Sequence, residues 1–258
     1  MDLGIKGLRV MISAGANGIG LEIARAFVRE GARVHVCDVD EAALEQLART
    51  DAQLTWTRCD VAARTDVAAF FAAGLAQLGG LDCLVNNAGI AGPTGRIDEI
   101  DPAEWDRCIA IDLTGQFNCV RLAVPELRKS GNASIVNVSS LAGRLGFAMR
   151  TPYAAAKWGV IGLMRSLAAE LGPDNIRVNA LLPGIVAGER QVRVLTAKAQ
   201  ARGVSFEEME KLAFSYTSLK EYVTPQQLAD LVVFVASPRG RMISGQALSV
   251  CGDTQMLS

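Results

Sequence analysis

The chain has 258 residues, 50% hydrophobic and 21% charged, with a formal net charge of −1 at pH 7. This length fits one large α/β domain with a substantial core. The balanced charge, without a basic run, excludes a general nucleic-acid binder. The sequence shows no signal-peptide hydrophobic region and no run of about 18 apolar residues, so a cytoplasmic protein without membrane contact is expected.

The first predicted strand, residues 8–13, leads into a glycine-rich loop that opens an amphipathic helix over 21–30. Glycines in such a loop let the backbone turn tightly and approach a pyrophosphate, whose charge the helix N-terminus then meets. A strand, a loop and a helix in this order predict a dinucleotide site. The loop residues expected to contact the cofactor are Ser13, Gly15, Asn17, Gly18, Ile19 and Gly20.

Asp38 ends the second predicted strand, residues 33–37, about twenty residues after the loop. A carboxylate there accepts hydrogen bonds from both adenosine ribose hydroxyls and repels a 2′-phosphate. Neither Asn17 nor Val39 supplies a positive charge to hold that phosphate. The sequence therefore favours NAD over NADP as the cofactor.

Helices and strands then alternate strictly. We expect a helix over 41–49, a strand over 53–59, a helix over 65–78 and a strand over 81–85 that ends in Asn86–Gly89. The amides and small residues there suit a backbone pressed against the cofactor. A long helix over 102–129, interrupted near 113–115, comes next.

A β-branched strand over 133–139 ends at Ser139 and Ser140, where open α/β sheets place their ligands. Glycines and Pro152 mark the loop before a helix that runs from Thr151 to about Leu171. Tyr153 and Lys157 are one helical turn apart and share a face. An ammonium beside the phenol favours the phenolate, which makes Tyr153 a candidate acid/base.

The sixth strand, 176–182, ends at Pro183 and Gly184, and an inserted segment of helical spacing follows over 185–222. Its place after a strand end is typical of substrate lids. A helix over 225–236 and a seventh strand over 246–250 complete the pattern. This order predicts a doubly wound, parallel seven-stranded sheet with helices on both faces, in a single domain with a helical substrate lid.

The six cysteines are scattered without CxxC spacing, and most fall in apolar strand or helix patterns. They are expected to be reduced core residues. The only histidine, His35, lies inside the second predicted strand and is expected to be structural. A Ser/His/Asp triad or a multi-histidine zinc site is thus poorly supported, and no metal is predicted.

Taken together, these motifs resemble the short-chain dehydrogenase/reductase family over almost the whole chain. The resemblance implies a Rossmann-type fold and a catalytic group of Ser140, Tyr153 and Lys157. It also implies further cofactor contacts besides those of the first loop. These are Asp60 and Val61 at the adenine, Asn87, Ala88 and Gly89 in the NNAG motif, and Pro183, Gly184 and Val186 near the nicotinamide, together with Tyr153 and Lys157.

Four positions depart from the family pattern. Ala14 replaces a glycine, and we expect the adjacent Gly15 to supply the needed freedom. Asp112 replaces a catalytic asparagine that in the family acts largely through its main-chain carbonyl, by holding a water in a proton relay. Gly188 stands where a threonine often touches the cofactor amide, and Asp253 replaces a second glycine. None of these changes removes a catalytic side chain.

By this resemblance the protein is an NAD-dependent dehydrogenase that oxidises a secondary alcohol to a ketone, and a homotetramer. Two alternatives stay open. Asp38 disfavours an NADP-linked ketone or 3-oxoacyl reductase. A non-catalytic NAD(H)-sensing protein, suggested by Ala14 and Asp112, has no need of the intact serine, tyrosine and lysine.

The substrate is expected to be a polar, carbohydrate-derived or acidic hydroxyl compound, which suggests a place in carbohydrate metabolism. The loop before the Tyr153 helix carries Arg144 and Arg150, and the lid begins near Arg190. One or more of these arginines is a candidate to bind a carboxylate, sulfonate or phosphate. The alternative, solvated surface arginines, is at least as well supported because arginine is mostly exposed.

Overall fold

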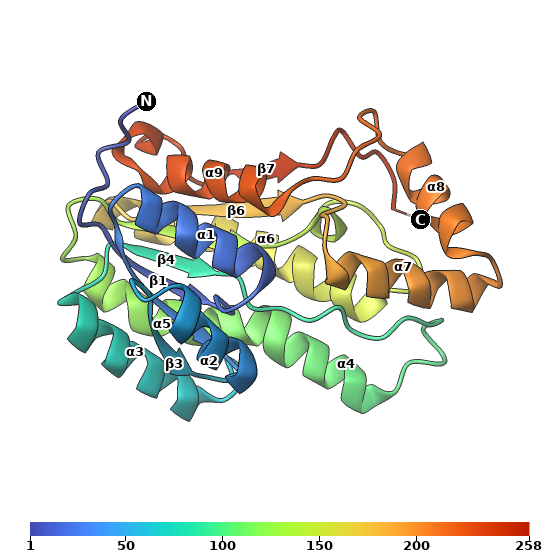
Figure 1. Cartoon of the computed structure of the whole chain (residues 1–258), viewed down its shortest axis with the longest axis horizontal. Coiled ribbons are helices and arrows are strands. Elements are labelled where there is room, and N and C mark those ends of the chain that lie inside the picture. The colour runs from blue at the N-terminus through green and yellow to red at the C-terminus, as the bar shows by residue number, and fades with distance from the viewer. Residues whose placement is uncertain (258) are drawn as a thin grey trace.

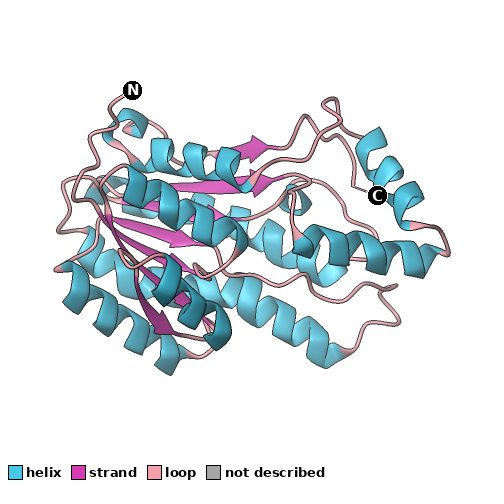
Figure 2. Cartoon of the chain, in the orientation of Figure 1, coloured by secondary structure: helices cyan, strands magenta, loops and turns pink. Residues whose placement is uncertain are grey.

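The structure is a computed structural model that describes residues 1–257. One parallel sheet of seven strands, in the order β3-β2-β1-β4-β5-β6-β7, forms the middle layer (Figures 1 and 2). This confirms the predicted doubly wound fold. The strands are β1 (Arg9–Ser13), β2 (Arg33–Asp38), β3 (Thr55–Arg58), β4 (Cys83–Asn86), β5 (Ser134–Val138), β6 (Arg177–Pro183) and β7 (Ala247–Val250).

Helices connect successive strands and cover both faces of the sheet (Figure 1). They are α1 (Gly18–Arg29), α2 (Glu41–Thr50), α3 (Arg64–Leu78), α4 (Pro102–Ile109), α5 (Gly115–Leu127), α6 (Thr151–Leu171), α7 (Glu189–Arg202), α8 (Phe206–Ser215) and α9 (Pro225–Ala236). Short 3₁₀ turns lie at Leu141–Gly143, Gly172–Asp174 and Pro238–Gly240. Within residues 1–257, no helix combines the length and apolar character required to cross a bilayer.

The two faces of the sheet form two separate cores because successive strand side chains point to opposite sides. On β1, Val10 and Ile12 pack in the cluster that contains buried residues of α1 and α9. Met11 packs on the other face, in the cluster of α3, α5 and α6. Strands buried on both faces explain the near-continuous apolar runs of the sequence.

The strand order reverses beside β1, whose neighbours are β2 on one side and β4 on the other. At such a switch the connections part to opposite faces and leave a crevice at the carboxyl ends of the strands. The arrowheads of the strands in Figure 1 point towards α7 and α8, which lie beyond this edge. These two helices have a small core of their own, which includes Leu195 and Met209.

The long helix expected over 102–129 is interrupted, as the sequence predicts, but the interruption covers Ala110–Thr114 and not 113–115. The chain does not leave the helix there; it passes through a π-helical turn between α4 and α5. One extra residue in a turn rotates the side chains of that segment, and such π-bulges occur frequently at functional sites. Here the turn places the carboxylate of Asp112 in the interior, where it is fully buried.

Gly15 does not take over the conformation that a glycine at position 14 would have. Ala14 itself has a left-handed backbone with φ of 51°. Gly15 is needed for a different reason: a Cβ there would lie 2.6 Å from the Cβ of Val36 on β2. The expectation that Gly15 compensates for Ala14 is therefore wrong, because each position has its own steric requirement.

His35 is buried in β2, and its ring nitrogens lie 2.7 and 3.0 Å from the hydroxyls of Thr55 and Thr57. Burial lowers the pKa of His35 to about 4, so the ring is neutral at physiological pH. The six cysteines are free thiols, five of them buried and Cys251 partly exposed. The structure thus places the histidine and the cysteines in packing positions.

Exchanging the small residues of the first loop tests their different roles. We expect Ala14→Gly to stabilise the fold by up to about 1 kcal/mol, because glycine adopts a positive φ without a Cβ clash. Gly15→Ala is expected to cost about 1–3 kcal/mol through overpacking against Val36. Chemical denaturation followed by circular dichroism measures both changes. Equal effects of the same sign would contradict this assignment.

Candidate active site

A cavity of about 430 Å³, here called the main cavity, lies at the carboxyl edge of the sheet. It is bordered by the first loop, the ends of β4, β5 and β6, the start of α6, and α7. The candidate residues that line it are Asn17, Gly18, Ile19, Asp38, Asn87, Gly89, Ser140, Arg150, Tyr153, Lys157, Pro183, Gly184, Val186 and Arg190. Segments far apart in the sequence therefore meet in one place.

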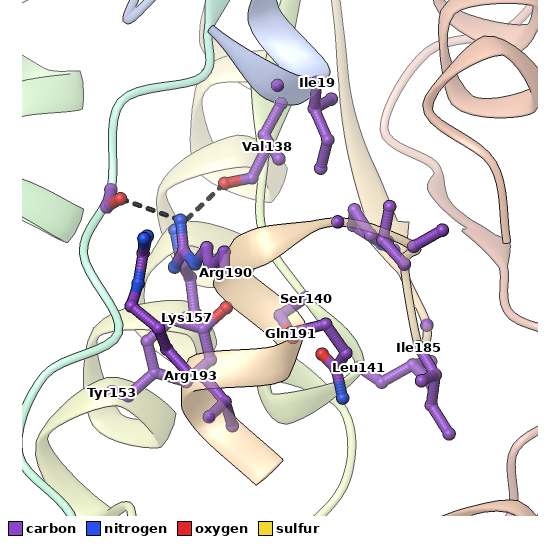
Figure 3. A pocket seen from close by; sticks show the side chains of 18 of the residues that line it. Ile19, Val138, Ser140, Leu141, Tyr153, Lys157, Ile185, Arg190, Gln191 and Arg193 are labelled. Carbon is purple, nitrogen blue, oxygen red and sulfur yellow. Dashed lines mark hydrogen bonds between the residues drawn. The ribbon is translucent and has the colours of Figure 1, made fainter. Parts of the chain in front are cut away.

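Lys157 is a buried cation of the site, with 2% of its surface exposed. Its Nζ donates to the carbonyl of Val138 at 3.2 Å, and Figure 3 shows the two side by side. The same Nζ lies 5.6 Å from the centre of the Tyr153 ring. Both side chains rise from α6 into the main cavity, one turn apart. The ammonium is thus placed to stabilise a phenolate.

Asp112 lies behind Lys157 and does not border the main cavity. Its Oδ1 accepts a 2.7 Å hydrogen bond from the backbone of Ile90, and its Oδ2 lies 3.4 Å from the ammonium of Lys157. The second contact is an ion pair without an aligned hydrogen bond. The carboxylate therefore provides the counter-charge that a buried lysine requires.

Ser140 follows β5 and begins the 3₁₀ turn with its side chain. Its Oγ accepts a 3.1 Å hydrogen bond from the backbone of Ala142, which fixes the hydroxyl at the rim of the main cavity. Figure 3 shows Ser140, Tyr153 and Lys157 around one space that α7 covers. A hydroxyl donor, a phenol and an ammonium around one space are the groups that proton transfer at a carbinol oxygen requires.

The N-terminus of α1 faces the main cavity and suits an anionic dinucleotide. Asn17 caps this helix without a side-chain hydrogen bond, and the first turn contains no acidic residue. The free backbone N–H groups are therefore available to a pyrophosphate. A Cβ on Gly20 would lie 2.1 Å from the carbonyl of Ala14, so only glycine permits this close packing of helix and loop.

Asp38 is held rigidly at the end of β2. Its Oδ2 accepts from the backbone of Ala16 at 3.1 Å, and its Oδ1 accepts from the backbones of Val39 and Asp40 at 2.8 and 3.2 Å. The side chain is 9% exposed and borders the main cavity. A fixed carboxylate at this edge suits hydrogen bonds from ribose hydroxyls.

Several candidate cofactor residues lie outside the lining and support it. The Oγ of Ser13 accepts 3.0 Å hydrogen bonds from the backbones of Asn87 and Ala88, which joins the ends of β1 and β4. Asp60 accepts from the backbone of Ala62, and the carbonyl of Val61 accepts from the side chain of Asn118 on α5. Gly15 and Gly20 permit close packing.

The three candidate arginines have different environments. Arg144 is exposed and does not border the main cavity. Arg190 is exposed on α7, and its guanidinium donates a 2.8 Å hydrogen bond to the carbonyl of Gly89 (Figure 3). Arg150 is buried, with 2% of its surface exposed, and borders the main cavity.

Lys198 is a cation of the cavity that the sequence analysis missed. It lies on α7, is 3% exposed, and its Nζ lies 4.2 Å from the centre of the Phe147 ring. Burial and the nearby Arg202 and Arg150 lower its pKa to about 7. Its helical spacing from Val194 and Leu195 on an inward face was the available signal, but a lysine is seldom buried.

Comparison with known proteins identifies similar families and structures. A family model described as enoyl-(acyl carrier protein) reductase matches residues 13–252. Cis-4-hydroxycyclohexanecarboxylate dehydrogenase of Sinomonas cyclohexanicum is 37% identical, with 94% of each chain covered. D-xylose 1-dehydrogenase of Caulobacter vibrioides is 34% identical, with 93% of each covered. A solved variant of actinorhodin polyketide ketoreductase with NADPH has a TM-score of 0.88 at 31% identity, covering 97% of each chain.

Fold and cavity together define an oxidoreductase that uses a nicotinamide dinucleotide and acts on CH–OH groups. The chain belongs to the short-chain dehydrogenase/reductase family, since the family match covers most of its length. The two dehydrogenases described above are named for a cyclic hydroxy acid and for a sugar.

Replacing Asp112 separates its charge from its hydrogen bond. We expect Asp112→Asn to retain activity within about tenfold, because the amide oxygen still accepts from Ile90 and Lys157 keeps its bond to Val138. Asp112→Leu is expected to lose far more activity and about 1–3 kcal/mol of stability, because a buried N–H loses its acceptor. Steady-state kinetics and thermal melting compare the two. Equal losses would show that the negative charge is the essential feature.

Proposed function

We propose that the protein is an NAD-dependent dehydrogenase that oxidises a secondary alcohol to a ketone. The observation that carries this proposal is the meeting of Ser140, Tyr153 and Lys157 in the same cavity as Asp38 and the N-terminus of α1. Groups for proton transfer and groups for holding a dinucleotide thus share one space. Reaction partners held in such contact gain much of their rate from positioning.

The residues have separable roles in this reaction. Tyr153 takes the hydroxyl proton as a phenolate, and Ser140 donates a hydrogen bond to the same oxygen. Lys157 stabilises the phenolate and binds the nicotinamide ribose, while Asp112 and the Val138 carbonyl keep the ammonium in place. Bound NAD supplies the hydride acceptor. Pro183, Gly184 and Val186 line the nicotinamide end of the main cavity.

The preference for NAD over NADP rests on Asp38. Three backbone N–H groups hold its carboxylate in one orientation, so it cannot turn away from a 2′-phosphate without losing them. Asp40 adds a second carboxylate to the same end of the main cavity. Both charges oppose a phosphate on the adenosine ribose.

The substrate of this proposal is a polar hydroxyl compound, carbohydrate-derived or acidic. Polar and cationic side chains of α7 border the main cavity, among them Arg190, Gln191 and Arg193 (Figure 3). The relatives named for a hydroxy acid and for xylose agree with this class. Residues 185–222 act as the lid in a single-domain protein, since α7 covers the catalytic group.

We expect a cytoplasmic homotetramer. Phe117 on α5 and Trp158 on α6 are 43% and 50% exposed, and apolar aromatic side chains on long helices suit a contact with a second copy.

An NADP-linked ketone reductase is the second candidate. Its support is the structural similarity to a ketoreductase with NADPH. The carboxylate of Asp38 is the feature that argues against it.

The first test measures NADH absorbance during incubation with NAD⁺ or NADP⁺ and a panel of hydroxy acids, sugars, polyols and secondary alcohols. We expect turnover with NAD⁺ and a loss of at least about 100-fold in Tyr153→Phe, because the phenol is the proton acceptor. Tyr216→Phe, outside the lining of the main cavity, is the matched control. No turnover with any alcohol despite tight NADH binding would support an NAD(H) sensor instead.

The second test concerns the choice of cofactor. Asp38→Asn removes the charge and keeps a side-chain acceptor. Because a neutral amide oxygen accepts weaker hydrogen bonds from the ribose hydroxyls than a carboxylate does, kcat/KM with NAD⁺ is expected to fall by roughly tenfold or more. The KM for NADP⁺ is expected to fall at the same time, because the repulsion is gone. Asp40→Asn, two residues further along the chain, serves as the control. We expect it to change the preference for NAD⁺ over NADP⁺ less than Asp38→Asn does. An unchanged ratio of the two cofactors in Asp38→Asn would assign the preference to other residues.

A further inference from the structure

Charges are distributed unevenly along the main cavity. Its acidic lining residues, Asp38 and Asp40, lie at the end proposed for adenosine. Its cationic lining residues are Arg150, Lys157, Arg190, Arg193 and Lys198, on α7 and around the start of α6. Among the described residues, no carboxylate lines this second end. Lys157 is paired with Asp112 and Arg193 with Glu189, so the excess positive charge of this end comes from Arg150, Arg190 and Lys198.

A second cavity of about 430 Å³ adjoins the same cations. It lies between α7 and the loop after β4, and Arg150, Arg190 and Arg193 line it without any acidic residue. Arg150 borders both cavities. The positive charge is thus a property of the region around Arg150 and not of one wall.

Arg150 is a buried guanidinium with incomplete partners. One of its terminal nitrogens donates to the backbone carbonyl of Ala91. Its Nε and Nη1 are buried and have no hydrogen-bond partner among residues 1–257. No described carboxylate lies within 4.0 Å of it, and burial lowers the pKa of Arg150. A protein seldom leaves such donors unsatisfied.

Lys198 approaches from the lid side. Its ammonium lies over the Phe147 ring, and the guanidinium of Arg150 lies 5.4 Å from the centre of the same ring. Within the described residues Lys198 also has no ion pair or hydrogen bond of its own. An aromatic face attracts cations more weakly than a carboxylate at the same distance. Among residues 1–257, neither of these two basic side chains therefore has an anionic partner.

A buried guanidinium without a counter-charge destabilises a fold, because it loses its hydration. With a pKa of about 7, the amine of Lys198 is partly neutral near pH 7, and an anion bound between the two side chains favours its protonated form. A cavity wall that nevertheless contains them is explained if a bound ligand supplies the negative charge. The Nε–H and Nη1–H of Arg150 point to different edges of the guanidinium plane, so a carboxylate oxygen can accept from Nη1–H in a charge-assisted hydrogen bond. The unsatisfied donors of Arg150 therefore indicate that the ligand carries an anionic oxygen acceptor.

We infer that Arg150 and Lys198 form a subsite that binds the carboxylate of a hydroxy-acid substrate, with its hydroxyl at Tyr153. This inference rests on the proposed dehydrogenase activity and narrows its substrate class. The guanidinium of Arg150 lies 5.3 Å from the centre of the Tyr153 ring, so both side chains can contact one small molecule. Arg150 binds from α6 and Lys198 from α7, which couples substrate binding to the lid.

The binding test uses a ligand that cannot react. Cyclohexanecarboxylate and neutral cyclohexanecarboxamide are titrated calorimetrically into the protein saturated with NAD⁺. The wild type is expected to bind the acid at least tenfold more tightly than the amide. In Arg150→Met and Lys198→Met this preference is expected to fall below threefold. Equal affinity of both ligands for the wild type would overturn the inference.

A matched variant and a stability measurement separate binding from structure. Arg202→Met removes an exposed cation one turn from Lys198, outside the lining, and is expected to keep the tenfold preference. Lys198→Met is expected to melt no lower than the wild type, since it replaces a buried amine that has no partner among residues 1–257 by an apolar side chain. If Arg150→Met fails to fold, the preference for the acid over the amide is measured in Lys198→Met and Arg150→Lys instead. Full acid preference in both would overturn the subsite.

Turnover distinguishes this inference from the proposed function. The substrates are 4-hydroxycyclohexanecarboxylate, its carboxamide and cyclohexanol, each with NAD⁺. A kcat/KM at least tenfold higher for the acid, lost in both variants, supports the subsite. Oxidation of all three alcohols alike, without preferential acid binding, overturns the subsite and leaves the dehydrogenase. Preferential acid binding without oxidation of any alcohol supports the subsite and overturns the dehydrogenase.

Discussion

The ion pair of Lys157 and Asp112 joins four parts of the chain behind the main cavity. Lys157 comes from α6, Asp112 from the π-helical turn, the accepting carbonyl from β5 and the Ile90 N–H from the loop after β4. A buried ammonium without these partners would lose its hydration without compensation. Tyr153 lies one turn from Lys157 on the same helix, with its ring centre 5.6 Å from the ammonium, so the contacts that hold the ammonium also keep it beside the phenol. The contacts that satisfy the buried Lys157 ammonium therefore also join the elements that surround the proposed catalytic group.

Arg150 and Lys198 are also buried basic side chains, but among residues 1–257 neither has a carboxylate partner. Lys157 has a carboxylate inside the protein, whereas these two cations border the cavity beside an aromatic ring. A charge whose partner is internal maintains the structure. A charge whose partner is missing is available to a ligand. The cations unpaired within the described part of the chain make the substrate end of the main cavity positive, whereas Asp38 makes the cofactor end negative.

Membership of the short-chain dehydrogenase/reductase family accounts for the shared fold and not for the details of this site. Ala14 adopts a left-handed conformation that glycine would adopt without strain. Asp112 adds a full charge next to Lys157. Ala14 lies in the proposed cofactor loop and Asp112 lies beside Lys157, so both departures are close to groups that the proposed reaction uses.

The sequence by itself determined the sheet, its helices and the group of Ser140, Tyr153 and Lys157, because apolar periodicity and the local spacing of one helical turn are written along the chain. Thr151–Leu171 and Pro225–Ala236 appear with the predicted bounds. Only the tertiary structure decided that Arg150 is buried, that Arg144 is exposed and that Lys198 joins the site. Whether an arginine or lysine lies in solvent or in a cavity depends on which distant elements cover it. Such contacts between α7 and the start of α6 have no signature in either segment alone.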